Sequence, residues 1–251
     1  MLYLIGAGLD IGDISVGAIL TCKHCDLYVD KYTSFMNEER IHYLSGLFGK
    51  EPRNLDRSDL EENLPALLKR ALTKDITIIT GGDPLVATTH KIIFLEARKI
   101  GLRVKVIHSS SVVSALIGES GLDFYRFGQI CTISRWSKHY TPVSFYETIQ
   151  RNLKNNLHSL VLLDYEPSKN ASLELKEAVR ILEEAEKKYK GKIIKPMTMI
   201  FVMHKVALPD SQRMITPLRR AKLLTFGNGP TAIIIPAKLT EIEKEVMGSM
   251  F

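Results

Sequence analysis

Cysteine is scarce in this chain of 251 residues, since only three occur and three cannot pair evenly. A framework of disulfide bonds is therefore excluded, and a reducing, cytoplasmic setting is expected. The sequence has no run of about 18 apolar residues, so it predicts no membrane-spanning helix. The first ten residues, MLYLIGAGLD, carry no basic flank and are not typical of a secretory signal.

The chain also lacks a strong excess of either charge. It has 34 Lys and Arg against 28 Asp and Glu, for a formal net charge of +6. This charge is too sparse for a nucleic-acid-binding arm, so direct nucleic-acid binding is not expected, whereas docking on an acidic protein patch is compatible with it. Hydrophobic residues make up 45% of the chain, which excludes a disordered protein.

Strand and helix patterns alternate over the first half of the chain. Short apolar runs at 2–5 and 75–80 end in glycine turns and predict strands, and a helix is predicted over 87–100. Further strands are predicted over 103–108 and 124–133. Such a series is typical of a mostly parallel sheet with helices on its faces.

The second half is expected to form a separate α/β lobe. The polar stretch 137–143 contains a proline and is interpreted as a linker, which places the predicted domains at 1–137 and 138–251. An amphipathic helix is predicted over 172–190. Further strand patterns lie at 159–164, 198–204 and 231–236.

Several helix starts are predicted from capping residues. Asp13 is expected to cap the first helix. Three capping boxes begin at Ser58, Ser144 and Thr240, each followed three residues later by a glutamate that can bond back to the cap.

Two motifs are typical of familiar chemistry but lack residues that this chemistry needs. Gly6-Ala7-Gly8 follows a strand, as in dinucleotide-binding turns, but Ile11 stands where a third small residue is required. Cys22 and Cys25 form a CxxC pair, yet a zinc site needs four ligands and no second pair exists. We interpret the glycines as a tight turn and the cysteines as core residues, and we predict no metal site.

The strongest local signal is the segment 80–90, TGGDPLVATTH, between a predicted strand and a predicted helix. Its glycines let the backbone bend close to a ligand, and the Asp83 carboxylate can accept hydrogen bonds. Ligands of open α/β sheets lie at such strand ends, so the segment predicts a polar small-molecule site. His90 and His108 lie near this turn and are candidates for a proton acceptor, but the sequence assigns no catalytic residue.

The strand–GDP–helix arrangement, together with LYLIGxGL near the amino terminus, resembles the tetrapyrrole-methylase-like (class III) methyltransferases. The strings GDPLVATTH, VIHSSSVVSA, GLDFYRFG and LHSLVLLD are similar specifically to the diphthine synthase family. The similarity runs over nearly the whole chain and is densest between residues 76 and 130. It implies a bilobal α/β fold with a mostly parallel N-terminal sheet, a mixed C-terminal sheet and a cofactor cleft between the lobes.

The resemblance also implies which residues contact the cofactor, S-adenosylmethionine. These residues are Leu9, Asp83, Val86, Ser111, Val112, Leu163, Val206 and Thr231. The chain departs from the family pattern at Gly81, at His204-Lys205, where an Ala-Arg step is common, and at Thr231, where His is frequent.

The implied reaction is methylation of the amine on the 3-amino-3-carboxypropyl-histidine of translation elongation factor 2, which forms diphthine in diphthamide biosynthesis. The family resemblance further implies a homodimer. Two alternatives stay open at this point. One is another class III methyltransferase that acts on a tetrapyrrole precursor or RNA, and the other is a non-catalytic module that keeps the cofactor cleft. The number of methyl groups transferred is also left open.

Overall fold

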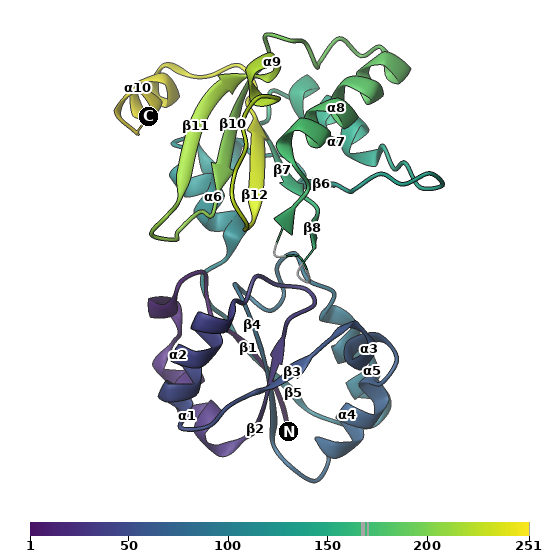
Figure 1. The fold of residues 1–251 in the computed structure, drawn as a ribbon, viewed down its shortest axis with the longest axis vertical. Helices are drawn as coiled ribbons and strands as arrows, with labels where there is room; N and C mark the ends of the chain where they lie inside the picture. Colours follow the sequence, from purple (N-terminus) through teal and green to yellow (C-terminus); the bar gives the residue numbers. More distant parts are fainter. Residues whose placement is uncertain (167–168, 170, 251) are drawn as a thin grey trace. The chain divides into compact units, whose positions relative to one another are not determined.

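The computed structural model describes residues 1–166, 169 and 171–250. The chain divides into two compact units, Met1–Ser114 and Ala115–Phe251, which we describe one at a time (Figure 1). No helix in the described part of the chain has both the length and the apolar character needed to cross a membrane.

The boundary between the units falls inside α6 (Val112–Glu119), earlier than the boundary expected at residues 137 and 138. The segment between these positions contains β6 (Cys131–Ile133), which pairs with β7 (Ser159–Leu163) and so belongs to the second unit. The boundary at 137 and 138 stays a prediction about which segments fold independently.

The first unit contains a five-stranded sheet in which every pairing is parallel, in the order β3-β2-β4-β1-β5. Its strands are β1 (Leu2–Gly6), β2 (Asp26–Asp30), β3 (Arg53–Leu55), β4 (Ile76–Thr80) and β5 (Val104–Ile107). All five residues of β4 are buried. This explains why ITIIT is β-branched throughout and shows no polar alternation, because helices cover both faces of a parallel sheet.

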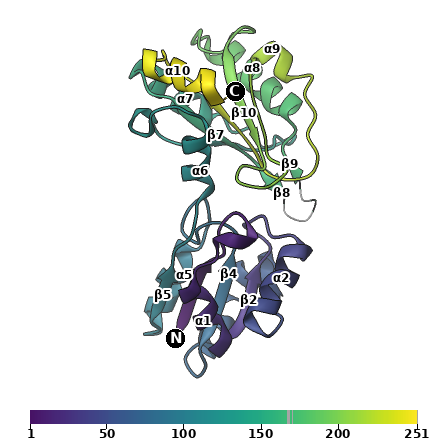
Figure 2. The same cartoon turned by 90° about the vertical axis from the view of Figure 1, so that its left-hand side faces the viewer.

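Helices cover the two faces of this sheet, as Figure 1 shows on either side of the strands. The helices of one face are α1 (Val16–His24) and α2 (Glu38–Phe48). Those of the other face are α3 (Arg57–Glu61), α4 (Leu64–Arg70) and α5 (Lys91–Lys99). Each face has its own apolar core cluster, so the sheet is buried on both sides. Figure 2 shows the same strands from the side.

The two cysteines of the CxxC motif lie in the core cluster under α1 and α2. Cys22 is 0% exposed and Cys25 is 4% exposed, and both thiols are free. Burial raises the pKa of the Cys22 thiol to about 12, so no reactive thiolate forms there at neutral pH. The interpretation of these cysteines as core residues is confirmed.

The second unit contains a mixed five-stranded sheet in the order β11-β10-β12-β7-β6. β6 runs parallel to β7, and the other three pairings are antiparallel. The remaining strands of this sheet are β10 (Met199–His204), β11 (Gln212–Pro217) and β12 (Thr231–Ile235). The α/β fold with a parallel first sheet and a mixed second sheet, expected from the sequence, is confirmed.

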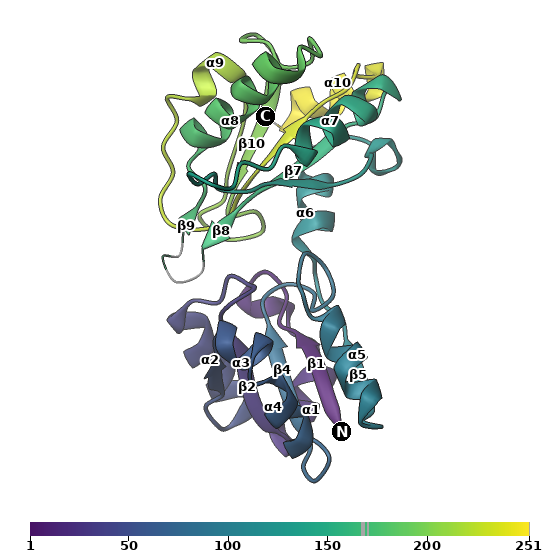
Figure 3. The same ribbon diagram turned by 90° about the vertical axis from the view of Figure 1, so that its right-hand side faces the viewer.

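Helices and a short ribbon complete the second unit. Core residues of three helices pack together with the sheet: α7 (Ser144–Lys154), α8 (Leu175–Tyr189) and α9 (Leu218–Ala221). The other elements are η2 (Phe124–Arg126), β8 (Tyr165–Glu166), β9 (Ala171–Ser172) and α10 (Glu241–Met250). Figure 3 shows β8 and β9 below the end of β7.

The expected strand over 124–133 is wrong in its first half, because residues 124–126 form η2 and only Cys131–Ile133 is a strand. The Asp123 side chain accepts a hydrogen bond from the amide of Tyr125 at 3.0 Å, which favours this turn over an extended chain.

Candidate functional site

Three loops meet at the carboxyl edge of the first sheet, because parallel strands end on the same side. They follow β1, β4 and β5, and they carry five of the residues that the family resemblance singles out. These residues are Leu9, Asp83, Val86, Ser111 and Val112. All of them are partly exposed except Asp83, which is 6% exposed. The structure therefore brings these five residues to one edge of one sheet.

The loops after β1 and β4 are joined by their main chains at Gly8 and Gly82. The amide of Gly8 donates to the carbonyl of Gly82 at 3.2 Å. Their φ angles are +78° and +72°, a backbone region that residues with a side chain rarely adopt. A β-carbon on Gly8 would collide with the side chain of Asp13. Glycine is needed here for this close approach of two loops, in agreement with the predicted tight turn.

A buried arginine from α2 holds the loop after β1. Arg40 is 5% exposed, and its guanidinium donates to the carbonyls of Ala7 and Leu9 at 2.7 and 2.9 Å. It also donates to the carbonyls of Gly8 and Asp10 at 2.6 and 3.3 Å. Burial lowers the pKa of Arg40 to about 10, so it stays charged at neutral pH. One cation thus turns four successive carbonyls inward.

Asp13 holds the same loop from its other side. Its carboxylate accepts from the amides of Leu9 and Asp10 at 2.8 and 3.1 Å, and from the hydroxyl of Ser110 in the loop after β5. Burial alone would raise the pKa of Asp13, but these hydrogen bonds outweigh it and hold the pKa below its ordinary value. The predicted cap of the first helix is therefore wrong, because Ser15 caps α1 while Asp13 closes η1 (Ile11–Asp13).

Asp83 uses its carboxylate to fix the turn after β4. Oδ1 accepts from the amide of Leu85 at 2.9 Å. Oδ2 accepts from Nδ1 of His108 at 2.7 Å and from the amide of Ser109 at 3.3 Å. Asp83 thus joins the turn after β4 to the end of β5. The His108 side chain is 66% exposed.

His90, the other histidine near this turn, is buried. It is 1% exposed, with Nδ1 3.0 Å from the carbonyl of Pro84 and Nε2 3.0 Å from Oδ2 of Asp30. Both ring nitrogens therefore face oxygen atoms of the protein, one a carbonyl and the other a carboxylate. Burial would raise the pKa of Asp30, but hydrogen bonds from His90 and Thr33 hold it below its ordinary value. His90 therefore fixes the turn 83–90.

Residues 87–90 belong to this turn, although the sequence predicts that a helix already begins at 87. Ala87 has a φ of +56°, and α5 begins at Lys91. Left-handed backbone at a residue other than glycine is strained, and surrounding contacts must hold it. Here the hydroxyl of Thr88 donates to the carbonyl of Pro84 at 2.7 Å, beside the bond from His90.

The remaining three candidate residues come together at one edge of the second sheet. Leu163 ends β7, Val206 follows β10 and Thr231 begins β12. Because β12 runs antiparallel to β7 and β10, its beginning lies beside their ends. These residues are 4%, 6% and 8% exposed, so their side chains are buried within their own unit.

Two of the departures from the family pattern, His204 and Thr231, are partners in the structure. They face each other in the register of β10 and β12, and Nδ1 of His204 lies 2.8 Å from the Thr231 hydroxyl. Burial lowers the pKa of His204, as does the neighbouring charge of Lys205. The His204 ring is stacked on Phe226 at 5.0 Å between centroids. The Thr231 hydroxyl is therefore already hydrogen-bonded within the protein.

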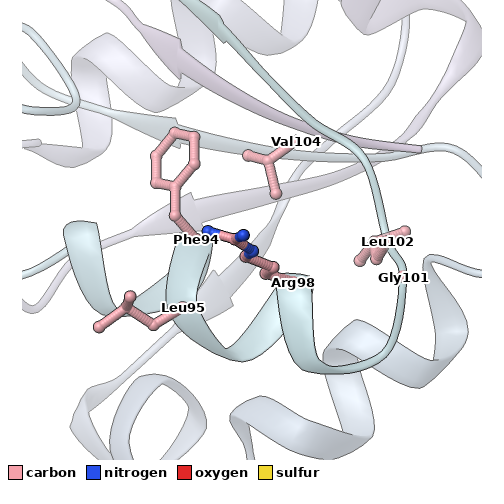
Figure 4. A pocket seen from close by; sticks show the side chains of 6 residues that line it. All are labelled: Phe94, Leu95, Arg98, Gly101, Leu102 and Val104. Atoms are coloured by element: carbon pink, nitrogen blue, oxygen red, sulfur yellow. The ribbon is translucent and has the colours of Figure 1, made fainter.

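A hollow of about 480 Å³ lies elsewhere in the first unit, between α5 and the beginning of β5 (Figure 4). Phe94, Leu95, Arg98, Gly101, Leu102 and Val104 line it. It lies at the amino end of β5, whereas Ser111 and Val112 follow the carboxyl end. None of the eight candidate residues lines this hollow. Among the residues that the structure describes, no group of three His, Cys, Asp or Glu side chains is placed to hold a metal ion.

The sequence reasoning missed Arg40 and Asp30, which hold the loops that carry the candidate residues. Arg40 belongs to α2, and nothing in the local sequence separates it from a solvent-exposed arginine. Asp30 ends a strand, and a strand-end carboxylate of a parallel sheet is the one signal that points to it.

Comparison with known proteins defines the class of this protein. A model of the family described as Tetrapyrrole (Corrin/Porphyrin) Methylases matches residues 1–222, and the chain belongs to this family. It is 37% identical over 256 residues to a diphthine synthase from Methanothermobacter thermautotrophicus, covering 98% of this chain and 94% of that protein.

A second diphthine synthase, from Methanospirillum hungatei, is 33% identical over 253 residues, covering 98% of this chain and 96% of the relative. A crystal structure of diphthine synthase matches with a TM-score of 0.84 and 30% identity, covering all of this chain and 96% of that one. The resemblance to diphthine synthases expected from the sequence is confirmed, and so is the expectation of a methyltransferase.

Proposed function

We propose that this protein transfers methyl groups from S-adenosylmethionine to the amine of the 3-amino-3-carboxypropyl-histidine of translation elongation factor 2, the step that forms diphthine. The similarity to diphthine synthases over 98% of the chain carries this proposal. The loop geometry supports it, because the GDPLVATTH segment forms a strained, tightly held turn at a sheet edge where ligands of such folds bind.

The residues at the first sheet edge suit S-adenosylmethionine. Leu9, Val86 and Val112 are apolar and partly exposed, which fits a purine ring or an aliphatic chain. The Ser111 hydroxyl and the main chain of the turn at Asp83 offer polar partners for a sugar or an amino-acid end. We assign these five residues, together with Leu163, Val206 and Thr231 of the second unit, to cofactor contact. When bound, the cofactor supplies a methyl group on a positively charged sulfur.

The chain's task in such a reaction is mainly positional. The acceptor nitrogen must lie about 3–3.5 Å from the methyl carbon and in line with its bond to sulfur. An amine with a pKa of about 8–10 is mostly protonated at neutral pH, so it must also lose a proton before it can attack.

The proposal includes the partners and the setting expected from the sequence. Elongation factor 2 is the protein substrate, the protein works as a homodimer, and it is located in the cytoplasm. The net charge of +6 supports docking on an acidic surface of the substrate.

A labelled-methyl assay tests the function. The protein is incubated with labelled S-adenosylmethionine and with elongation factor 2 that carries the 3-amino-3-carboxypropyl-histidine. We expect transfer of label and a mass increase of the factor that counts the methyl groups. Unmodified elongation factor 2 serves as the control substrate. Transfer to a tetrapyrrole precursor or to RNA instead would overturn the proposal.

Calorimetry tests the cofactor site separately from the reaction. Asp83→Ala removes the acceptor that joins the turn after β4 to the end of β5, so we expect the affinity for S-adenosylmethionine to fall by at least about tenfold. Asp26→Ala, at the opposite end of the same sheet, is the matched control and should bind as the unaltered protein does. Equal affinity in the two variants would remove Asp83 from the site.

A further inference from the structure

Methylation of an amine needs a group that accepts a proton, and the first sheet edge offers two histidines. His90 cannot serve, because it is 1% exposed and both its ring nitrogens already face acceptor oxygens. With the ring buried and each nitrogen against an oxygen of the protein, neither nitrogen is open to a substrate.

His108 differs from His90 in each of these respects. Its Nδ1 is bonded to Oδ2 of Asp83 at 2.7 Å, and a carboxylate there fixes the hydrogen on Nδ1. Nε2 then carries a lone pair, and no residue in the described part of the chain is hydrogen-bonded to it. The side chain is 66% exposed and lies at the edge where the cofactor residues gather.

We propose that His108 is the proton acceptor of the methyl transfer and that Asp83 orients and supports it. This inference rests on the proposed function. It assigns to Asp83 a role in the reaction besides its role in the turn, and it names a catalytic residue that the sequence leaves unassigned.

Nε2 of His108 takes one proton from the ammonium group of the substrate, and the amine nitrogen gains a free electron pair. The nitrogen attacks the methyl carbon, the carbon–sulfur bond breaks, and its electron pair stays on sulfur. Each new methylammonium that still bears a proton can lose it to His108 in the next round, so the same residue serves every methyl group added.

The surroundings of His108 suit this cycle. Asp83 contacts the ring directly and stabilises the charged imidazolium, as the carboxylate does in a catalytic triad. The hydroxyl of the neighbouring Ser109 donates to the main-chain carbonyl of Asp13 at 3.0 Å, which joins the end of β5 to the loop after β1. Because the His108 ring is exposed, it can return its proton to water between rounds.

The test uses His108→Asn in the full-length protein. The amide nitrogen of Asn can replace Nδ1 as a donor to Asp83, but Asn offers no base in place of Nε2. We expect kcat to fall by about 100-fold or more, which is the usual contribution of a general base, with the affinity for S-adenosylmethionine unchanged in calorimetry. His42→Asn, which replaces an exposed histidine of α2, is the matched control and should keep the full rate.

Two further readouts separate a catalytic role from a structural one. Added imidazole should raise the rate of His108→Ala in proportion to its concentration, because it can enter the exposed position and act as the base. Nitrogen NMR of the free protein at a pH where the ring is neutral should show the hydrogen of His108 on Nδ1 and none on Nε2.

The outcomes are distinct for the two proposals. An unaltered rate in His108→Asn, loss of rate only through lost cofactor affinity, or a hydrogen on Nε2 would overturn the role of His108 and leave the proposed function intact. Failure of the unaltered protein to methylate the elongation factor would overturn both.

Discussion

Buried charged side chains lie in both units, but they stand in different relations to the candidate binding residues. In the first unit, the buried Arg40 and Asp83, together with the exposed Asp13, hold the loops that carry these residues. In the second unit the buried charge is Glu243, which is 2% exposed and bonded to His158 at 2.9 Å, just before β7 begins.

The candidate residue Leu163 lies at the other end of β7. Glu243 and His158 are therefore remote from the candidate residues of the second unit. Glu243 also accepts from the amide of Thr240 at 2.8 Å and contacts Arg126, which fastens α10 to the sheet. Buried charge therefore has two uses in this chain. It holds the loops of the candidate site in the first unit, and it anchors α10 in the second.

The largest expected effect is that of Arg40→Met. The substitution leaves four carbonyls of the loop 7–10 without their shared donor, so we expect unfolding free energy to fall by about 4 kcal/mol. The affinity for S-adenosylmethionine should fall as well, because the loop carries Leu9. Urea unfolding and calorimetry measure the two effects.

Arg98→Met replaces an exposed arginine of α5 and is the control for the loss of charge. Arg40→Lys keeps the charge with fewer donors and should give an intermediate loss. If Arg40→Met lowered stability but left cofactor affinity unchanged, buried charge would serve only stability in both units. The difference between the units would then not exist.

Glu243→Gln tests whether the buried charge of the second unit acts on stability alone. Burial would raise the pKa of Glu243, but hydrogen bonds from Thr240, His158 and Asp123 lower it to about 2. Because the folded-state pKa is depressed, the stabilisation is present above about pH 4.5 and is lost as the pH falls toward 2. A shift from 4.5 to about 2 corresponds to about 3 kcal/mol by linkage.

We therefore expect Glu243→Gln to lower the unfolding free energy by about 3 kcal/mol at pH 7 and to flatten its pH dependence between pH 5 and 2. Cofactor affinity should not change. Glu241→Gln, in the first turn of the same helix with an 84% exposed side chain, is the control. A weaker cofactor affinity in Glu243→Gln would contradict the assignment of this cluster to helix anchoring.

The smallest effect is expected at the pair His204 and Thr231. His204→Phe keeps a ring stacked on Phe226, and Thr231→Val keeps the shape of the side chain, so each removes the hydrogen bond with little repacking. The double-mutant cycle should give a coupling of about 1 kcal/mol in unfolding free energy. Additive effects would mean that this 2.8 Å contact contributes nothing, and that the two departures from the family pattern are independent.

The elements with a strong apolar period were predictable from the sequence. The helix expected over 172–190 is α8, whose buried residues include Ala178, Val179, Leu182 and Ala185. The capping box at Thr240 is confirmed, since its hydroxyl accepts from the amide of Glu243 at 3.2 Å.

The boxes at Ser58 and Ser144 are wrong. Asp56 caps α3, and α7 begins after Val143 without a side-chain cap. α3 begins at a different four-residue capping box, because Asp56 accepts from the amide of Asp59 and Asp59 accepts from the amide of Asp56.

The candidate site was predictable where its residues are consecutive, and not where distant segments meet. The turn at Asp83 is formed by consecutive residues, so its motif can be recognised in the sequence. The contact of Arg40 with the carbonyls of Ala7 and Leu9 joins residues more than 30 positions apart, so no local period signals it. The roles of His90 and His108 differ only through burial and through the partners of each ring nitrogen, which depend on the assembled sheet.

The buried thiols have a practical consequence for measurement. Cys22 and Cys131 each have a pKa raised to about 12 by burial, and the pKa of Cys25 is raised by burial as well. The natural thiols should therefore react slowly with maleimide dyes, which attack through the thiolate. One introduced cysteine in each half of the chain can then carry a donor and an acceptor fluorophore over a low background. Energy transfer between the dyes would report whether the distance between the two labelled positions changes when S-adenosylmethionine is added.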